Sequence, residues 1–367
     1  MYFPEDTEDP YMFCTYLNVS PLTIPSFAHD LELDEMIGMV GNDSIKMSMI
    51  CLAFKTKLPF HELFKELNIW ILRNDLIARF VKSVDIFSSE GVGFDKNKWI
   101  QFQEQRDSIK IILNTLYQSK IPIQGNCLIY ESEQSLIPSF KWERPLVTDE
   151  ENHIILATEA MRIFMKFIPK KNFIPIFLNL FLEKKIIVCS VDMQYVCWII
   201  LALHFLLRPL YWVCGSVSSL PYILEEYLDS PNPMIFGLTF NTSYFAPENV
   251  CIDLTKKKIY TPPCPDPPFK KDFTDSINNL WDKENSHLLI LKYCNDYIKK
   301  VIGSVQSCIM TNFTDPVHVN SIFMSELFLG HFKPEERDFC NDLKDTQMFT
   351  FYVEQECRKK SDQMVFQ

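Results

Sequence analysis

The sequence predicts an α/β protein made of three parts, and three observations support this prediction. Between residues 151 and 260, short apolar runs alternate with longer segments of helical periodicity, as in a layered α/β domain. Earlier in the chain, residues 45–53 show the period-two pattern of a half-buried strand. Later, five prolines within residues 261–269 form a stiff strap, and residues 273–360 then show strong helical periodicity with few strand signals.

The first part is expected to contain a strand and two helices. Apolar side chains occupy the odd positions of residues 45–53, and the segment 58–60, Leu-Pro-Phe, then interrupts the pattern. A helix of about five turns is predicted from His61. Its apolar stripe consists of Leu63, Phe64, Leu67, Trp70 and Ile71. A second amphipathic helix is predicted between residues 99 and 117.

A connection separates the first part from the second. Residues 119–151 are rich in Pro, Gly, Ser and acidic residues, which is typical of an exposed link between domains. The elements predicted next are helices at 154–167, 174–183 and 192–207, with a strand at 185–189. Asp192 is expected to cap its helix, because its carboxylate can accept backbone N–H groups of the first turn.

The middle part continues with three strands and one further helix. The strands are predicted at 210–214, 234–238 and 250–254, and the helix opens at Ser219, with Pro221 close to its first position. The predicted domain limits are 1–120, a linker at 121–150, then 151–260 and 261–367. Four aliphatic residues at the centre of the α/β layer are predicted to be buried: Leu182, Ile187, Ile200 and Leu203.

Composition limits the classes of partner and compartment. The formal net charge is −11, with 36 basic and 47 acidic residues, which argues against a nucleic-acid partner. Twelve scattered cysteines without a CxxC pair, and an N-terminus without a signal-like apolar region, predict reduced thiols and a cytoplasmic protein. The most apolar run, residues 195–207, is shorter than the ~20 residues of a transmembrane helix. Its His204 has no metal-ligand spacing to another His or Cys.

No pattern of catalytic residues stands out in the sequence. The chain contains no GxSxG elbow, P-loop, GxGxxG turn, HExxH pair or Asp-rich calcium loop. With nine glycines it also has little backbone suited to holding a phosphate. The sequence therefore predicts a binding or regulatory protein with no cofactor, no metal and no covalent chemistry.

Several motifs occur in the order and spacing of a known family. Residues 177–190 form a helix end with Glu-Lys-Lys before an apolar strand, and residues 227–237 place two prolines, separated by one residue, ahead of a strand ending in Gly. Further matching segments are 50–64, 206–212, 217–221, 297–304 and 345–354. Together they resemble the DENN-domain family. Residues 217–221 have one proline fewer than the family motif, and the segment before Ile45 is shorter than the family's first module.

The resemblance implies a fold and a function. The fold would be a shortened longin-like module at 1–120, a central DENN module at 151–260 and a helical downstream module at 261–367. The function would be that of a guanine nucleotide exchange factor for a Rab-family small GTPase in vesicle traffic, bound between the longin-like and central modules. The implied location is the cytoplasm, with peripheral recruitment to vesicle or endosomal membranes.

Two other functions are compatible with the resemblance. One is activation of GTP hydrolysis by an arginine of the first module, for which Arg73, Arg79 and Arg106 are the candidates. The other is a scaffold that binds small GTPases without exchanging their nucleotide. Assays of nucleotide release and of GTP hydrolysis distinguish the three functions.

The residues predicted to touch the partner lie on the central module. The turn at 229–233 contributes Asp229, Ser230 and Asn232, because its two prolines hold its shape at little entropic cost on binding. The helix end contributes Glu183, Lys184 and Lys185, which are expected to be exposed. A rigid connection and a solvated helix end are the alternative interpretations of the two segments.

Overall fold

The structure is a computed structural model of the chain, which forms two compact units, Tyr11–Asn152 and His153–Gln367. We describe each unit by itself. The residues that the structure describes are 11–19, 48–56, 60–73, 114–115, 118–120, 122–131, 139–146, 149–240, 242, 247–315 and 318–365. The helix predicted at 99–117 falls almost wholly outside these residues, as do Arg79 and Arg106.

The first unit begins with a pair of long strands. Strand β1 (Tyr11–Val19) pairs antiparallel with β2 (Ser48–Thr56), with Tyr11 opposite Thr56. The strand predicted at 45–53 is therefore present from residue 48, and it continues to Thr56; residues 45–47 lie outside the described residues. Helix α3 (His61–Arg73) begins where the sequence predicts, and the residues that directly follow Arg73 lie outside the described part of the chain.

A second strand pair packs on α3 and corrects the predicted linker. Strands β3 (Cys127–Tyr130) and β4 (Phe140–Glu143) are antiparallel, and the side chains of Tyr130, Phe140 and Trp142 are buried with the apolar stripe of α3. The expectation of an exposed connection is therefore wrong for these two segments. Strands of four residues are too short to offset the Pro, Gly and acidic residues around them in a composition-based interpretation.

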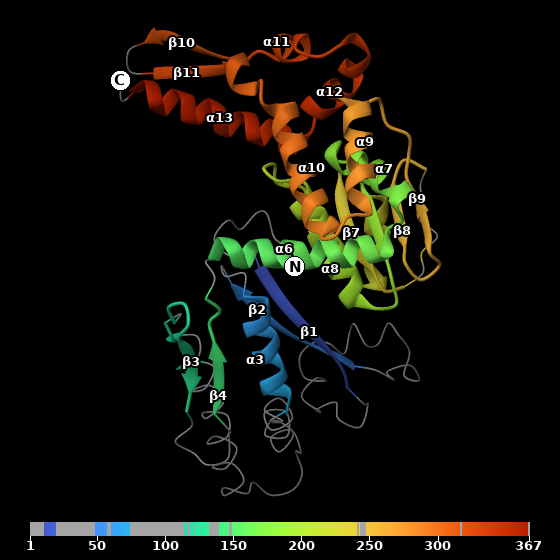
Figure 1. The fold of residues 1–367 in the computed structure, drawn as a ribbon, viewed down its shortest axis with the longest axis vertical. Coiled ribbons are helices and arrows are strands. Elements are labelled where there is room, and N and C mark those ends of the chain that lie inside the picture. Colours follow the sequence, from blue (N-terminus) through green and yellow to red (C-terminus); the bar gives the residue numbers. More distant parts are fainter. Residues whose placement is uncertain are drawn as a thin grey trace, which may run out of the picture. The chain divides into compact units, whose positions relative to one another are not determined.

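The second unit contains a five-stranded sheet (Figure 1). Its order is β6-β7-β5-β8-β9, with parallel pairing throughout except for the antiparallel edge strand β9. The strands are β5 (Ile186–Cys189), β6 (Gly215–Val217), β7 (Met234–Leu238), β8 (Val250–Asp253) and β9 (Lys258–Tyr260). Strands alternate with helices, so the predicted mixed α/β class is confirmed.

Three helices precede or follow the central strand β5. They are α6 (Asp149–Phe167), α7 (Lys170–Phe181) and α8 (Met193–Leu206). Asp192 caps α8 as predicted, since its side chain accepts the backbone N–H of Gln194. Leu182, Ile187, Ile200 and Leu203 are all buried, as predicted.

Two predictions in this region are wrong. The strand expected at 210–214 lies instead at Gly215–Val217, because Leu210 and Trp212 are apolar side chains of the core and do not belong to the sheet. The helix expected after Pro221 is η2 (Tyr222–Asp229), a 3₁₀ helix with Pro221, not Ser219, at its N-cap. Strand β9 was not predicted.

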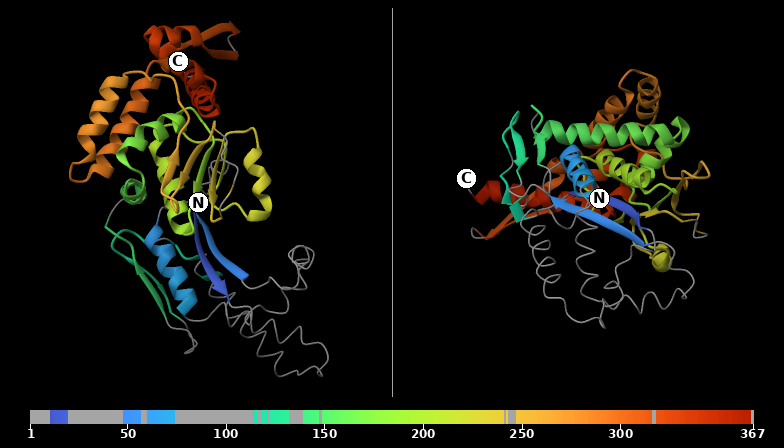
Figure 2. Two further views of the ribbon diagram at one scale, coloured as in Figure 1. Left: turned by 90° about the vertical axis from the view of Figure 1, so that its right-hand side faces the viewer. Right: turned by 90° about the horizontal axis from the view of Figure 1, so that it is seen from below.

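The two faces of the sheet are covered differently. On one face, a Cβ atom at Gly237 of β7 would lie 2.5 Å from Val196 of α8 and 2.1 Å from the carbonyl oxygen of Ser218, which follows β6. On the opposite face, Leu228 of η2 packs with Phe236, in a cluster that also contains Ile187, Cys189, Leu220, Leu238 and Cys251. In the left view of Figure 2, η2 (yellow) lies on one side of the sheet, and the orange helices of residues 270–302 lie on the other.

The chain after the sheet is helical with one exception. The proline-rich strap at 261–267 is neither helix nor strand, as predicted. The helices are α9 (Lys270–Trp281), α10 (Ser286–Ile302), η3 (Val305–Cys308), α11 (Ser325–Gly330), η4 (Pro334–Glu336), α12 (Arg337–Lys344) and α13 (Gln347–Val365). Strands β10 (Ile309–Asp315) and β11 (His318–Phe323) form an antiparallel pair that the helical interpretation missed.

Candidate protein-binding site

The predicted partner residues lie at the amino ends of two neighbouring strands. Glu183, Lys184 and Lys185 directly precede β5, and the turn at 229–233 directly precedes β7. Because β5 and β7 are parallel, with Ile186 opposite Ile235, their amino ends meet at the same edge of the sheet. The structure thus brings Lys185 together with the turn, and it directs Glu183 elsewhere.

Lys185 holds the backbone of the turn. Its Nζ donates hydrogen bonds to the carbonyl oxygens of Leu228, at 2.7 Å, and of Ser230. Burial lowers the pKa of the Lys185 amine, while the carboxylates of Asp229 and Glu248 act in the opposite direction. The amine is therefore engaged within the fold, and we assign it to fixing the shape of the turn.

The turn itself is closed by two further hydrogen bonds. The backbone N–H of Ser230 donates to the carbonyl of Tyr227 at 3.1 Å, and the N–H of Asn232 donates to Ser230 Oγ at 3.4 Å. The side chains of Asp229 and Asn232 are exposed, and Ser230 is half-buried. Asp229 and Asn232 thus offer polar side chains on a backbone that is already fixed.

Glu183 is a structural residue, which corrects the expectation of an exposed partner contact. Its side chain is buried, and its carboxylate accepts the backbone N–H groups of Gln347 at 2.7 Å and Met348 at 2.6 Å. These groups belong to the first turn of α13, where a negative charge is favourable. Burial raises the pKa of the Glu183 carboxyl, and the two N–H donors oppose this rise.

The burial of Glu183 could not be predicted because its hydrogen-bond partners lie far from it along the chain. A Glu-Lys-Lys run after a helix has the composition of a solvated helix end, and Lys184 is indeed exposed. The partners of Glu183 lie 164 and 165 residues later, and no local pattern indicates them. Glu183 also has a left-handed backbone with φ of 52°, which is rare for residues other than glycine.

An exposed apolar surface beside the turn was missed by the sequence interpretation. We define the η2 surface as the exposed side chains of η2, namely Tyr222, Ile223, Leu224, Glu226, Tyr227 and Asp229. The four large apolar members would be expected in a core, yet between 38% and 69% of each is exposed. The available signal was the sequence Tyr-Ile-Leu-Glu-Glu-Tyr-Leu-Asp, which contains five apolar residues, although only Leu228 among them is buried.

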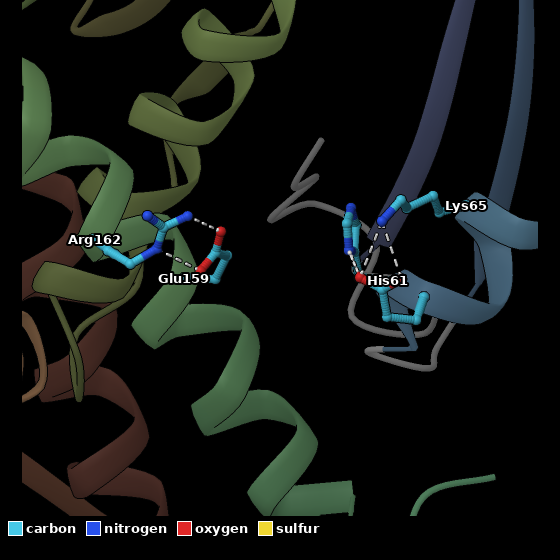
Figure 3. A network of polar contacts seen from close by, with 5 residues as sticks. His61, Lys65, Glu159 and Arg162 are labelled. Carbon is cyan, nitrogen blue, oxygen red and sulfur yellow. Dashed lines mark hydrogen bonds and ion pairs between the residues drawn. The ribbon is translucent and has the colours of Figure 1, made fainter.

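The ion pairs on helices α3 and α6 have local roles. On α3, Lys65 and His61 contact Glu62, and on α6 Arg162 forms two hydrogen bonds with Glu159 (Figure 3). Each pair lies within a single helix. Exposed pairs of this type stabilise a helix by only about 0.3–0.5 kcal/mol, and they form no concave site.

One buried histidine and three buried cysteines are held in their neutral forms. Burial lowers the pKa of His204 to about 3, and its Nε2 lies 3.1 Å from Ser216 Oγ. Burial likewise raises the pKa of the Cys189, Cys214 and Cys251 thiols to about 12. A protonated thiol is a poor nucleophile. Within the described ranges, no group of three or more His, Cys, Asp or Glu side chains is arranged to hold a metal ion.

The helices also bear on membrane association. Among the residues that the structure describes, none of the helices is both long and apolar enough to span a bilayer. The apolar helix α8 is 14 residues long and packs in the core of the second unit.

Comparison with known proteins identifies a family whose domain matches this part of the chain. The model of the DENN (AEX-3) domain matches residues 96–257, which include β5 to β8, the Lys185 turn and the whole η2 surface. No curated protein matches the chain. The match agrees with the motifs at 177–190 and 227–237, which the structure places on the two central parallel strands and the segments before them. Residues 96–257 of the chain therefore match the DENN-domain family.

Proposed function

We propose that this protein is a guanine nucleotide exchange factor, which binds a Rab-class small GTPase and promotes release of its GDP in the cytoplasm or at vesicle membranes. The observation that carries the proposal is the DENN match over residues 96–257, because the resemblance implies exchange activity. The exposed apolar side chains of η2 support a binding role, because such groups mark interaction sites.

Exchange requires no covalent step. A protein that binds the nucleotide-free GTPase more tightly than the GDP-bound form weakens GDP binding by the same factor, because the coupling is reciprocal. A ~10³-fold acceleration of release requires about 4 kcal/mol of such preference. In this chain the preference would depend on a binding surface of fixed shape, such as the turn held by Lys185.

A panel of small GTPases tests the proposal. Each GTPase is loaded with fluorescent GDP, and release is followed with and without the protein in excess unlabelled GTP. We expect faster release from at least one Rab-class member, and tighter binding after magnesium chelation has removed its nucleotide. Faster hydrolysis of GTP without faster release would instead identify a GTPase-activating protein. Binding with equal affinity for the GDP-bound and empty forms would identify a scaffold.

A further inference from the structure

On η2, the side chain of Leu228 is buried and most of the other side chains are exposed. In a 3₁₀ helix, side chains three positions apart lie above one another. η2 has a kink at Leu224, whose φ of −104° and ψ of 18° are not helical. After the kink, Leu228 is buried and Glu225, three positions before it, is half-buried, whereas Glu226 and Asp229 are exposed in another row. The core contact is thus made by Leu228, with a further ring contact from Tyr222 to Phe240, whereas Ile223 and Tyr227 are exposed.

The apolar members of the η2 surface are not needed to fill the core beneath them. Leu228 already fills that position, in contact with the cluster around Phe236. Exposed fractions are 54% for Ile223 and 53% for Tyr227. Single exposed apolar residues are common, but a contiguous group on one element marks an interaction site.

The surface is also held in a fixed shape. Leu228 anchors η2 to the sheet, and the Lys185 amine fixes the carbonyls of Leu228 and Ser230 at its end. Pro221 precedes the helix, and Pro231 and Pro233 follow it. A surface of fixed shape loses little conformational entropy on binding, so its apolar contacts contribute more of their energy to affinity.

The charge of the surface indicates the chemistry of its partner. Residues 217–233 contain three carboxylates, from Glu225, Glu226 and Asp229, and no Lys or Arg. The whole chain has a formal net charge of −11. Because complementary potentials steer association and disfavour wrong partners, the matching face has an apolar centre with Lys or Arg at its edge.

We propose that the η2 surface is where the small GTPase docks on the second unit, through a GTPase face with an apolar centre and a basic edge. This inference rests on the proposed function, because that function supplies the occupant. Ile223 and Tyr227 form the centre of the contact and Glu226 its acidic edge. These three side chains contribute to affinity for the GTPase. The preference for the nucleotide-free form over the GDP-bound form is not assigned to them.

A matched pair of double variants tests the apolar contact. Ile223→Ser with Tyr227→Ser removes two large side chains from the η2 surface. Ile322→Ser with Tyr260→Ser removes the same residue types from β11 and β9, where they are 55% and 47% exposed. We expect the first variant to weaken binding of the nucleotide-free GTPase by about 30-fold and to slow exchange, as for central interface residues. The second variant is expected to bind within about twofold of the unaltered protein.

A matched pair of charge reversals tests the acidic edge. Glu226→Lys and Glu284→Lys change the net charge equally, and both residues are exposed, but only Glu226 belongs to the η2 surface. We expect Glu226→Lys to lower the association rate with the GTPase by about tenfold at low salt, and the difference to shrink as salt screens the charges. Glu284→Lys is expected to leave the rate within about twofold of the unaltered protein.

The outcomes separate this inference from the proposed function. If the unaltered protein exchanges nucleotide and the Ile223, Tyr227 variant binds as tightly as its control, the docking surface is wrong and the function stands. If no GTPase of the panel binds the unaltered protein, both are overturned. A weaker complex together with a fall in melting temperature that the control variant lacks would also overturn the docking surface, because those side chains would then support the fold.

Discussion

Glu183 and Lys185 are separated by one residue, and each fixes a different segment of the second unit. The Glu183 carboxylate accepts backbone N–H groups at the start of α13, whereas the Lys185 amine donates to carbonyls at the end of η2. The exposed side chain between them is Lys184. Three adjacent charged residues therefore have two structural roles and one solvated position.

The first prediction concerns Glu183. Glu183→Ala leaves the N–H groups of Gln347 and Met348 without their acceptor, which we expect to lower the free energy of unfolding by about 1–3 kcal/mol. Lys184→Ala is the control, because an exposed substitution changes stability by about 0.5 kcal/mol or less. Urea titrations of both variants measure the difference. Equal stability of the two variants would show that α13 does not depend on this carboxylate.

The second prediction concerns the pH dependence of stability. His204 has a pKa of about 3 in the folded state because burial disfavours its charge. Its unfolded pKa is about 6.5, so the unfolded state gains the proton first and stability falls as pH drops below that value. His204→Gln removes this contribution, and we expect the slope of unfolding free energy between about pH 6 and 4.5 to decrease by up to about 1.4 kcal/mol per pH unit. The slope of the variant will not be zero, because burial also lowers the pKa of His153, to about 4.

At the scale of elements, apolar patterns predicted burial better than they predicted strands. Strand β7 lies at the predicted positions, since it is a continuous apolar run in the middle of the sheet. Leu210 and Trp212 are buried as their pattern requires, but the sheet pairing begins only at Gly215. The pattern of apolar residues along the sequence indicates which side chains are buried. Strand pairing depends instead on backbone partners that lie elsewhere in the chain.

The same distinction explains the errors in the candidate site. The turn at 229–233 could be predicted because its prolines fix it locally. The role of Glu183 and the exposure of Tyr222 and Ile223 could not, because both depend on what packs nearby in space. From the sequence alone, each apolar residue of a helix is predicted to be buried. The exposure of the other apolar side chains of η2 can be recognised only when the structure shows that Leu228 makes the contact with the core.

The third prediction concerns how α8 packs on the sheet. Gly237→Ala would place a Cβ atom 2.1 Å from the backbone oxygen of Ser218, just after β6, and 2.5 Å from the Val196 side chain of α8, so both segments must move away from β7. We expect a loss of about 1–3 kcal/mol in unfolding free energy, or more if the backbone cannot adjust. Gly330→Ala is the control, because a Cβ atom there meets nothing within 4 Å. Similar melting temperatures for the two variants would contradict the close approach of α8.

At the scale of the whole molecule, the division into two units can be tested directly. Helix α6 begins at Asp149, and the second unit has its own core around β5. We expect a fragment of residues 149–367 to fold, with a cooperative thermal transition and the circular dichroism of a mixed α/β protein. A fragment that melts without cooperativity would show that the second unit requires residues of the first.

The same fragment gives the fourth prediction, on exchange. The resemblance implies that the GTPase contacts both the longin-like and the central modules, whereas the η2 surface lies in the second unit alone. We therefore expect the fragment to bind the GTPase and to exchange nucleotide more slowly than the full chain. Exchange at the full-chain rate would show that the central module acts without the first unit, and complete loss of binding would contradict a contact through η2.

The hydrogen bonds of Glu183 also impose an order on biosynthesis. Its two donors lie 164 and 165 residues downstream, so a ribosome adding ~5–20 residues per second reaches them roughly 8–33 seconds after it has added Glu183. During that interval strand β5 can pair with neighbouring strands, but the Glu183 carboxylate has no N–H groups of α13 to accept. The corner between α7 and β5 is therefore completed late in translation, after the rest of the sheet has been synthesised.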